Sequence, residues 1–225
     1  IVVLNTGSAV TLPWIDSVAA VVETWYPGQE DGDALAAVLF GDVVPAGKLP
    51  VTFPRSLADV PASTAEQWPG VAGRVHYTEG MLVGYRWYDA KGKAPLFPFG
   101  YGLSYTTFRF ANLTVSRGPG RSVSVGADIT NTGKRAGADV VQLYVGHPAA
   151  TGEPPRQLKA FAKVRLAPGQ TRHVTFRLDA RAFAQWDTSA DGWVVAPGEY
   201  QIFLGDSSAD LPLKGSVTPV AGKVQ

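Results

Sequence analysis

The chain has 225 residues, of which 45% are hydrophobic and 17% are charged, and its formal net charge is +1. This composition is enough for one large domain or two small ones, it excludes a disordered chain, and it gives no reason to expect nucleic acid or an acidic membrane surface as a partner. The absence of cysteine excludes disulfides and zinc–thiolate sites, and no stretch approaches the roughly 20 apolar residues that a membrane span needs.

The first four residues, Ile1–Leu4, form an apolar run that stops at the turn-like segment Asn5–Ser8. Such a run is typical of a strand that is buried on both faces, as in a parallel sheet. A strand of this kind needs neighbouring strands and helices above and below, and the residues that follow supply too few of either. We therefore expect the chain to be the C-terminal part of a longer protein.

Residues up to about Gly102 alternate helix-like and strand-like pieces. A short helical piece is expected around Leu12–Ser17, followed by an apolar run at Val18–Val22. The strongest helix signal covers Asp31–Phe40, where apolar residues recur at helical spacing, and Lys48–Phe53 is strand-like. The pattern is α/β but incomplete.

The helix at 31–40 carries acidic residues at its start, Glu30, Asp31 and Asp33, and Gly41 at its end. Carboxylates at a helix N-terminus are stabilised by the helix dipole, and glycine favours the left-handed conformation that commonly ends a helix. The acidic group also suggests a metal ion, but the helix explains it at once. We expect no metal site and no cofactor.

A segment rich in aromatic residues follows, with a strand-like stretch at Glu79–Tyr88 and then Pro95–Gly102. Glycines interleaved with aromatic residues indicate tight backbone packing against rings. We interpret this part as the seam between two domains.

From Thr106 onward the pattern is all-β. Apolar and polar residues alternate with period two around residues 122–129, 173–178 and 200–204, as in strands with one face in a core. Turn signals such as Asn131–Gly133 separate these runs. About seven strands are predicted, which indicates a two-sheet sandwich of the immunoglobulin or fibronectin type III kind.

Longer motifs add a family resemblance. They lie in both halves of the sequence and are Trp25–Glu30, Gly47–Pro54, Tyr77–Gly80, Val83–Asp89, Phe97–Thr106, Gly137–Val145 and Trp186–Asp187. In this order and spacing the chain resembles the C-terminal half of family 3 glycoside hydrolases, the β-glucosidase and β-xylosidase type. The resemblance covers essentially the whole chain.

The resemblance implies an enzyme of three domains: an N-terminal barrel, an α/β sandwich domain and a fibronectin type III-like domain. Residues 1–105 would form the C-terminal part of the α/β sandwich domain, and residues 106–218 the fibronectin type III-like β-sandwich. The last residues, 219–225, are expected to be a frayed tail. An N-terminal barrel with the nucleophile Asp, and a loop with the acid/base Glu, would precede residue 1 in the same protein or in a second chain. The retaining reaction needs two carboxyl groups about 5 Å apart. Neither the motif of the nucleophile Asp nor that of the acid/base Glu occurs in this sequence. The chain is therefore expected to support the active site and to be inactive alone.

Glu79 is the carboxylate that best suits an acid, because it lies among tyrosines and tryptophans that raise a carboxyl pKa by desolvation. The alternative is a structural Glu that pairs with Arg86 or accepts hydrogen bonds from a turn. We favour the structural interpretation, because one carboxyl cannot run a two-step reaction.

Five tryptophans could stack on sugar rings: Trp25, Trp68, Trp87, Trp186 and Trp193. Core packing is expected for most of them, and Trp68 is the best exception because it lies in the Pro/Gly-rich loop Pro61–Gly73. The three histidines, His76, His147 and His173, have no second ligand at metal spacing, so we expect them in loops or on solvent-facing strand positions.

Three hypotheses therefore stand. The first is a β-glucosidase-like enzyme portion that acts on small β-glycosides, with no nucleic acid or membrane as partner and with a homo-oligomer as an option. The second is a non-catalytic binding or scaffold module, and the third is an inactive relative. The sequence does not decide which sugar is the substrate. It also does not decide between a cytoplasmic and a secreted protein, although it slightly favours the cytoplasm.

Overall fold

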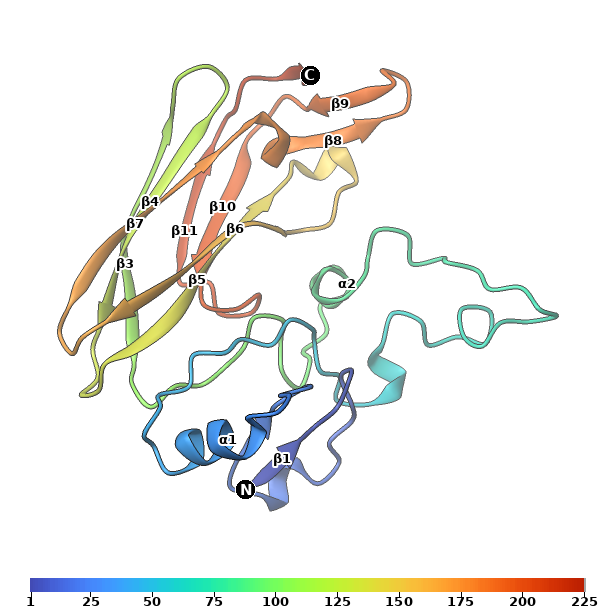
Figure 1. Ribbon diagram of the computed structural model, residues 1–225. Helices are drawn as coiled ribbons and strands as arrows, with labels where there is room; N and C mark the ends of the chain where they lie inside the picture. Colours follow the sequence, from blue (N-terminus) through green and yellow to red (C-terminus); the bar gives the residue numbers. More distant parts are fainter. Residues whose placement is uncertain (225) are drawn as a thin grey trace.

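In the computed structural model, which describes residues 1–224, a small irregular N-terminal half lies against one end of a β-sandwich (Figure 1). The N-terminal half holds two short strands, β1 (Val2–Leu4) and β2 (Val21–Glu23), and these pair in parallel. Its helices are α1 (Asp31–Leu39) and α2 (Tyr85–Lys91), with single 3-10 turns η1 (Ile15–Ser17) and η2 (Leu57–Asp59). Among the described residues, no helix is long and apolar enough to cross a bilayer.

Helix α1 confirms the helix predicted at 31–40. Asp31 and Asp33 lie in its first turn, where the helix dipole favours carboxylates. Gly41 follows it with φ of +85°, and its N–H donates to the carbonyl oxygen of Val38 at 3.1 Å. The left-handed conformation expected of this glycine is therefore present.

Three other predictions for this half are wrong. Strand β1 is not buried on both faces, because Ile1 and Val3 are exposed and its only partner in the described chain is β2. Residues 48–53 form one isolated bridge, Phe53 to Phe97, instead of a strand, because Pro50 has no N–H to donate to a strand partner.

The predicted strand at Glu79–Tyr88 is also wrong, since Tyr85 to Lys91 forms α2. Gly84 precedes this helix with φ of +54° and Gly92 ends it in the left-handed region. The helix buries Trp87 and Tyr88, and this tertiary burial overrides the preference of aromatic residues for strands.

Seven strands form the predicted sandwich, and its two sheets have the orders β3-β4-β7 and β11-β10-β5-β6. The bounds are β3 Phe108–Arg117, β4 Val123–Asn131, β5 Gly137–Gly146, β6 Gln157–Leu166, β7 Thr171–Leu178, β10 Tyr200–Gly205 and β11 Leu213–Val217. All neighbouring pairs are antiparallel. The α/β half followed by an all-β sandwich is thus the fold class that the sequence predicts.

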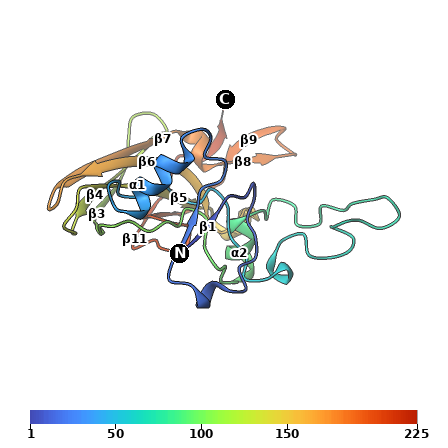
Figure 2. The ribbon, with the colours of Figure 1, turned by 60° about the horizontal axis from the view of Figure 1, so that its bottom comes forward.

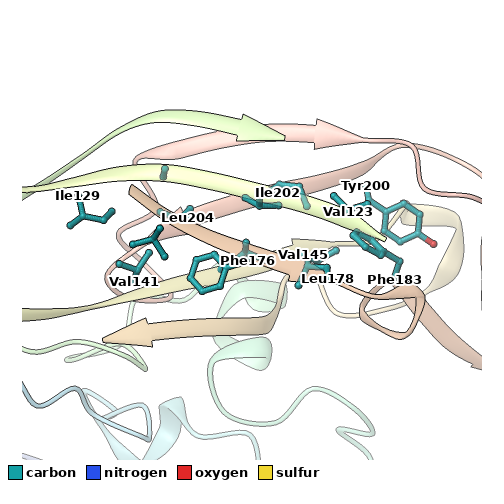
Figure 3. Packing of buried hydrophobic residues seen from close by; sticks show 14 of the residues in the cluster. Val123, Ile129, Val141, Val145, Phe176, Leu178, Phe183, Tyr200, Ile202 and Leu204 are labelled. Atoms are coloured by element: carbon teal, nitrogen blue, oxygen red, sulfur yellow. The ribbon is translucent and has the colours of Figure 1, made fainter. Parts of the chain in front are cut away.

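The sandwich core confirms the period-two patterns. The inward residues of β4, β7 and β10 are buried and meet those of β5 between the sheets (Figure 3). Ile129, Val141, Ile202 and Leu204 are fully buried there. Burial of such side chains stabilises the fold by about 1.5–3 kcal/mol each, before the entropy cost of ordering them.

The last described residues do not fray, in contrast to the predicted tail. Strand β12 (Gly222–Val224) pairs with β9 (Gly192–Val195), which pairs with β8 (Ala184–Asp187) in a third small sheet. Arg121 holds this end by donating to the carbonyl oxygens of Val220, Gly222 and Lys223. Gln225 lies outside the described residues.

Asn131, the last residue of β4 and the first of the predicted turn, is fully buried, and its side chain makes four hydrogen bonds. Its Oδ1 accepts from the Thr106 hydroxyl at 2.7 Å and from Gly133 N at 3.0 Å. Its Nδ2 donates to the carbonyl oxygens of Arg135 at 2.8 Å and Leu166 at 3.0 Å. One side chain therefore satisfies polar groups from four segments.

Asn131→Ala is expected to destabilise the chain by about 2–4 kcal/mol, because it leaves several buried polar groups unpaired. Urea unfolding followed by circular dichroism measures the change. Thr132→Ala, at an exposed position in the same turn, is the matched control and is expected to cost no more than about 1 kcal/mol. Equal costs for the two variants would contradict the role assigned to Asn131.

Candidate functional site

A buried ionic cluster joins the two halves. Lys48 Nζ lies 3.0 Å from Asp139 Oδ1 and 3.5 Å from Asp206 Oδ2, and it donates to the Gly102 carbonyl oxygen at 3.1 Å. The side chain of Lys48 is 11% exposed and that of Asp139 is 5% exposed. Burial raises the pKa of Asp206, and the positive charge of Lys48 opposes this rise. We call these three residues the seam cluster.

Beside the seam cluster, Gln142 of β5 links the halves through its side-chain amide. Its Nε2 donates to the carbonyl oxygens of Gly100 at 3.2 Å and Asp206 at 2.5 Å, and its Oε1 accepts from the Tyr144 hydroxyl at 2.6 Å. Gly100 has φ of +81°, and a Cβ there would lie 2.3 Å from Gln142 Oε1. This position of the seam therefore requires glycine.

Helix α2 is docked on the start of β6. Arg156 pairs with Asp89 through two hydrogen bonds, Nη2 to Oδ1 at 2.5 Å and Nε to Oδ2 at 3.1 Å. The Tyr85 hydroxyl accepts from the backbone N–H of Leu158 at 2.8 Å, and its ring stacks on Phe99 at 5.0 Å. A bidentate Arg–carboxylate pair is directional, so the helix is oriented as well as attached.

Residues 55–84, which we call the arm, extend away from both the sandwich and the rest of the N-terminal half in Figures 1 and 2. Helix α2 follows directly, and its Tyr88 hydroxyl donates to the Asp59 carbonyl oxygen at the base of the arm. Lys93 Nζ pairs with Asp59 Oδ1 at 2.8 Å. The docking of α2 on β6 therefore also positions the arm.

Glu79 lies in the arm and is half-buried. Its Oε2 accepts from Gln67 Nε2 at 3.1 Å, and its backbone carbonyl oxygen accepts from Leu82 N at 3.0 Å. The alternative ion pair with Arg86 does not form within residues 1–224. Glu79 thus contacts the amide of Gln67 and a turn, which agrees with a structural role. Its role in chemistry stays a prediction.

Trp68 lies in the arm and is 73% exposed in the described chain, so its ring is free to stack on another molecule. The other tryptophan candidates pack against neighbours: Trp25 against Phe53, the buried Trp87 against Tyr88, and Trp193 against Arg181 and the half-exposed Trp186. Whether Trp68 touches a substrate stays a prediction.

Two cavities lie in the N-terminal half. One of about 840 Å³ between α1 and the sandwich is lined by small and aliphatic residues together with charged ones, among them Glu23, Asp31 and Arg165. The other, of about 710 Å³, is lined mainly by apolar and aromatic residues, among them Trp25 and Phe53. A sugar site needs carboxyl groups and aromatic surface together, and neither cavity combines paired carboxyl groups with aromatic rings.

No group of three or more His, Asp or Glu side chains in residues 1–224 is arranged to hold a metal ion. His76 is exposed in the arm, and His173 faces solvent on β7, where its Nδ1 lies 2.7 Å from Asp128 Oδ1. Both agree with the predicted loop and strand positions.

His147, directly after β5, differs from this expectation because both ring nitrogens are buried without a hydrogen-bond partner. Its ring meets Tyr200 edge to face at 5.1 Å. Burial lowers the pKa of His147 to about 4, and the nearby Lys159 charge adds to the effect. Sequence reasoning missed this group, because nothing in the local pattern shows that the end of β5 is covered.

Comparison with known proteins gives the family. Residues 1–105 match the model of the glycosyl hydrolase family 3 C-terminal domain, and residues 139–208 match that of a fibronectin type III-like domain. The chain belongs to glycoside hydrolase family 3. The resemblance stated from the sequence motifs is thereby confirmed.

Three relatives of this family 3 chain illustrate the similarity. It is 47% identical over 221 residues to thermostable β-glucosidase B of Acetivibrio thermocellus, covering 96% of this chain and 29% of that protein. It is 44% identical to an exo-α-(1→6)-L-arabinopyranosidase of Bifidobacterium breve, covering 94% and 28%. The crystal structure of DesR, a β-glucosidase from Streptomyces venezuelae in complex with D-glucose, superposes with a TM-score of 0.93 at 42% identity, covering 97% and 28%. The chain thus spans less than a third of these proteins.

Lys48→Met is expected to destabilise the family 3 chain by about 3–5 kcal/mol, because it leaves Asp139 buried without its cation. Lys93→Met, which removes the far more exposed pair with Asp59, is the control and is expected to cost at most about 1 kcal/mol. Chemical unfolding at pH 7 measures both. A seam cluster without structural importance would give two equally small values.

The low pKa of His147 predicts a pH dependence of stability. The unfolded chain, with a histidine pKa near 6.5, binds more protons than the folded chain between about pH 6.5 and 4. The contribution of His147 to the free energy of unfolding is therefore fully present above pH 6.5. It falls by about 1–3 kcal/mol as the pH is lowered towards 4.

His147→Phe keeps a ring against Tyr200 and removes the titration, so this part of the loss is expected to disappear. His173→Gln is the exposed control. Urea unfolding at several pH values between 7.5 and 4.5 tests the difference, and identical pH profiles for wild type and His147→Phe would refute it.

Proposed function

We propose that this chain is the C-terminal portion of a retaining β-glucosidase-like glycoside hydrolase that releases terminal non-reducing β-linked glucose from small glycosides. In this proposal the chain supports the active site, and the nucleophile and the acid/base belong to another part of the enzyme. The observation that carries the proposal is the near-complete superposition on a glucose-bound β-glucosidase, at 42% identity across both halves.

The seam explains what such support consists of. The seam cluster with the adjacent Gln142, and separately the Arg156–Asp89 pair, fix the N-terminal half on the sandwich. An active site needs its surrounding groups held within fractions of an ångström, and a rigid scaffold supplies this. The sandwich would then act as a buttress that keeps α2 and the arm in one orientation.

We assign the selection of the sugar to another part of the enzyme. Relatives of nearly equal identity to this chain, 47% and 44%, are named for different sugars, glucose and L-arabinopyranose. If this portion selected the sugar, we would expect its sequence identity to differ clearly between glucosidases and arabinopyranosidases. The proposal of a glucoside as substrate rests instead on the names of most of the similar proteins.

A chimera tests the proposal. The C-terminal part of the Streptomyces venezuelae enzyme is replaced by residues 1–225 of this chain, and hydrolysis of an aryl β-glucoside is measured. The chimera is expected to turn over the substrate, and the 225-residue chain alone is expected to show none. Turnover by the chain alone, or a folded chimera without turnover, would overturn the proposal.

The same chimera separates the two interpretations of Glu79. Glu79→Gln keeps the size of the side chain, so a structural Glu79 predicts a kcat within about tenfold of the parent chimera. Loss of an acid/base group lowers kcat by about 10²–10⁴-fold. A loss of that size in a folded variant would place Glu79 in the chemistry.

A further inference from the structure

Helix α2 meets β6 through an ion pair that is largely buried. The side chain of Asp89 is 14% exposed and that of Arg156 is 24% exposed. Burial raises the pKa of Asp89, although the hydrogen bond and the positive charge of Arg156 oppose this rise. A buried pair of this kind adds little net stability, because the loss of hydration offsets the attraction between the charges. Its contribution lies in geometry, since two parallel hydrogen bonds fix the orientation of both groups.

Neighbouring contacts hold each partner of this pair in place. The guanidinium of Arg156 lies 5.6 Å from the ring centroid of Phe203. On the side of α2, the Tyr85 ring stacks on Phe99 and meets Tyr144 of β5 edge to face at 5.7 Å. All of these contacts are internal to the chain, so they are made whatever else surrounds it. The sandwich therefore sets the direction of α2.

The direction of α2 in turn sets the direction of the arm. Among residues 1–224, the side-chain hydrogen bonds and ion pairs between the arm and the rest of the chain all end on Asp59. Their partners are Tyr88 of α2 and Lys93, which lies two residues after the helix. The other end of the arm, Gly84, directly precedes α2. Both ends of the arm are thus tied to one short helix.

Such a connection makes the place of the arm sensitive to the orientation of α2. A rotation of the helix by a few degrees displaces the distant part of the arm by on the order of 1 Å, and a misplacement of that size can lower a catalytic rate about 100-fold. A directional ion pair at α2 is therefore a suitable device for holding the arm in one place.

The arm keeps its course in a complete enzyme. The superposition on the Streptomyces venezuelae β-glucosidase covers 97% of this chain and so leaves 3% of its 225 residues, about seven, outside. Most of residues 55–84 therefore lie within the superposed part. The same superposition covers only 28% of that enzyme. The arm thus has this direction where a much larger remaining part of the enzyme is present.

We propose that Asp89 and Arg156 are positioning residues for the reaction: by fixing the direction of α2, they fix where the arm meets the part of the enzyme that holds the catalytic carboxyl groups. This inference rests on the proposed function, because it takes the chain as the supporting portion of a β-glucosidase-like enzyme. In this proposal neither residue touches the substrate. Both act through the arm, whose contact with the remaining part of the enzyme holds the two portions in the geometry that an active site needs.

Two variants of the chimera described above test the positioning role. Asp89→Asn keeps the shape of the side chain and removes its charge, whereas Arg156→Lys keeps the charge and removes the bidentate geometry. Each is expected to lower kcat and kcat/KM together by at least about tenfold, with KM nearly unchanged. The double variant is expected to lose no more than the larger single loss, because both changes remove one contact.

Val125→Ala is the matched control for stability. It leaves a cavity at a fully buried position of β4, in the sheet that does not carry Arg156, so it lowers the melting temperature and is expected to leave kcat unchanged. All assays are made at a temperature at which circular dichroism shows each variant to be folded. Folded Asp89→Asn and Arg156→Lys variants with the kcat of the parent, or an equal loss of kcat in Val125→Ala, would overturn the positioning role.

Hydrogen exchange of the arm amides separates this inference from the proposed function. The amides of residues 55–84 are expected to be more protected in the parent chimera than in the 225-residue chain, and to lose this protection in the Asp89→Asn chimera. Equal protection in chimera and chain would sink the contact of the arm while leaving the proposed function intact. A folded parent chimera without turnover would count against the proposed function, and the exchange comparison would still decide whether the arm meets the remaining part of the enzyme.

Discussion

The ionic contact of Lys48 with Asp139 and Asp206 is the interaction on which the rest of the structure depends. Lys48 comes from the N-terminal half, Asp139 from β5 and Asp206 from the position directly after β10, and Lys48 and Asp139 are almost completely buried. A buried charge that loses its partner is costly, so this cluster forces the two halves into one relative placement. The hydrogen bonds of Gln142 and the docking of α2 by Arg156 are possible only in that placement.

This constraint explains how a chain with few regular elements in its first half has a defined functional surface. The sandwich has its own hydrophobic core. The N-terminal half has short strands, partly exposed apolar residues and two open cavities, so it relies on the seam for its order. The supporting role proposed within a β-glucosidase-like enzyme follows from this dependence.

The sequence predicts the parts whose structure is local. The alternation in β4, β7 and β10 and the capped helix α1 follow from residue period and end signals, and both are found. Helix α2 was missed because an aromatic-rich run fits a strand as well as a short helix, and only the burial of Trp87 and Tyr88 decides. The sequence places Lys48 in a strand-like segment. Its ionic role could not be predicted from there, because its partners Asp139 and Asp206 lie far away along the chain. The buried state of His147 and the projection of the arm are likewise set by tertiary contacts.

Differential scanning calorimetry of the 225-residue chain tests most directly whether the seam joins the two halves into one unit. The account predicts a single transition whose calorimetric and van't Hoff enthalpies agree, since the N-terminal half cannot stay folded once the seam opens. Two separable transitions, with the N-terminal half melting while the sandwich keeps its full enthalpy, would contradict it.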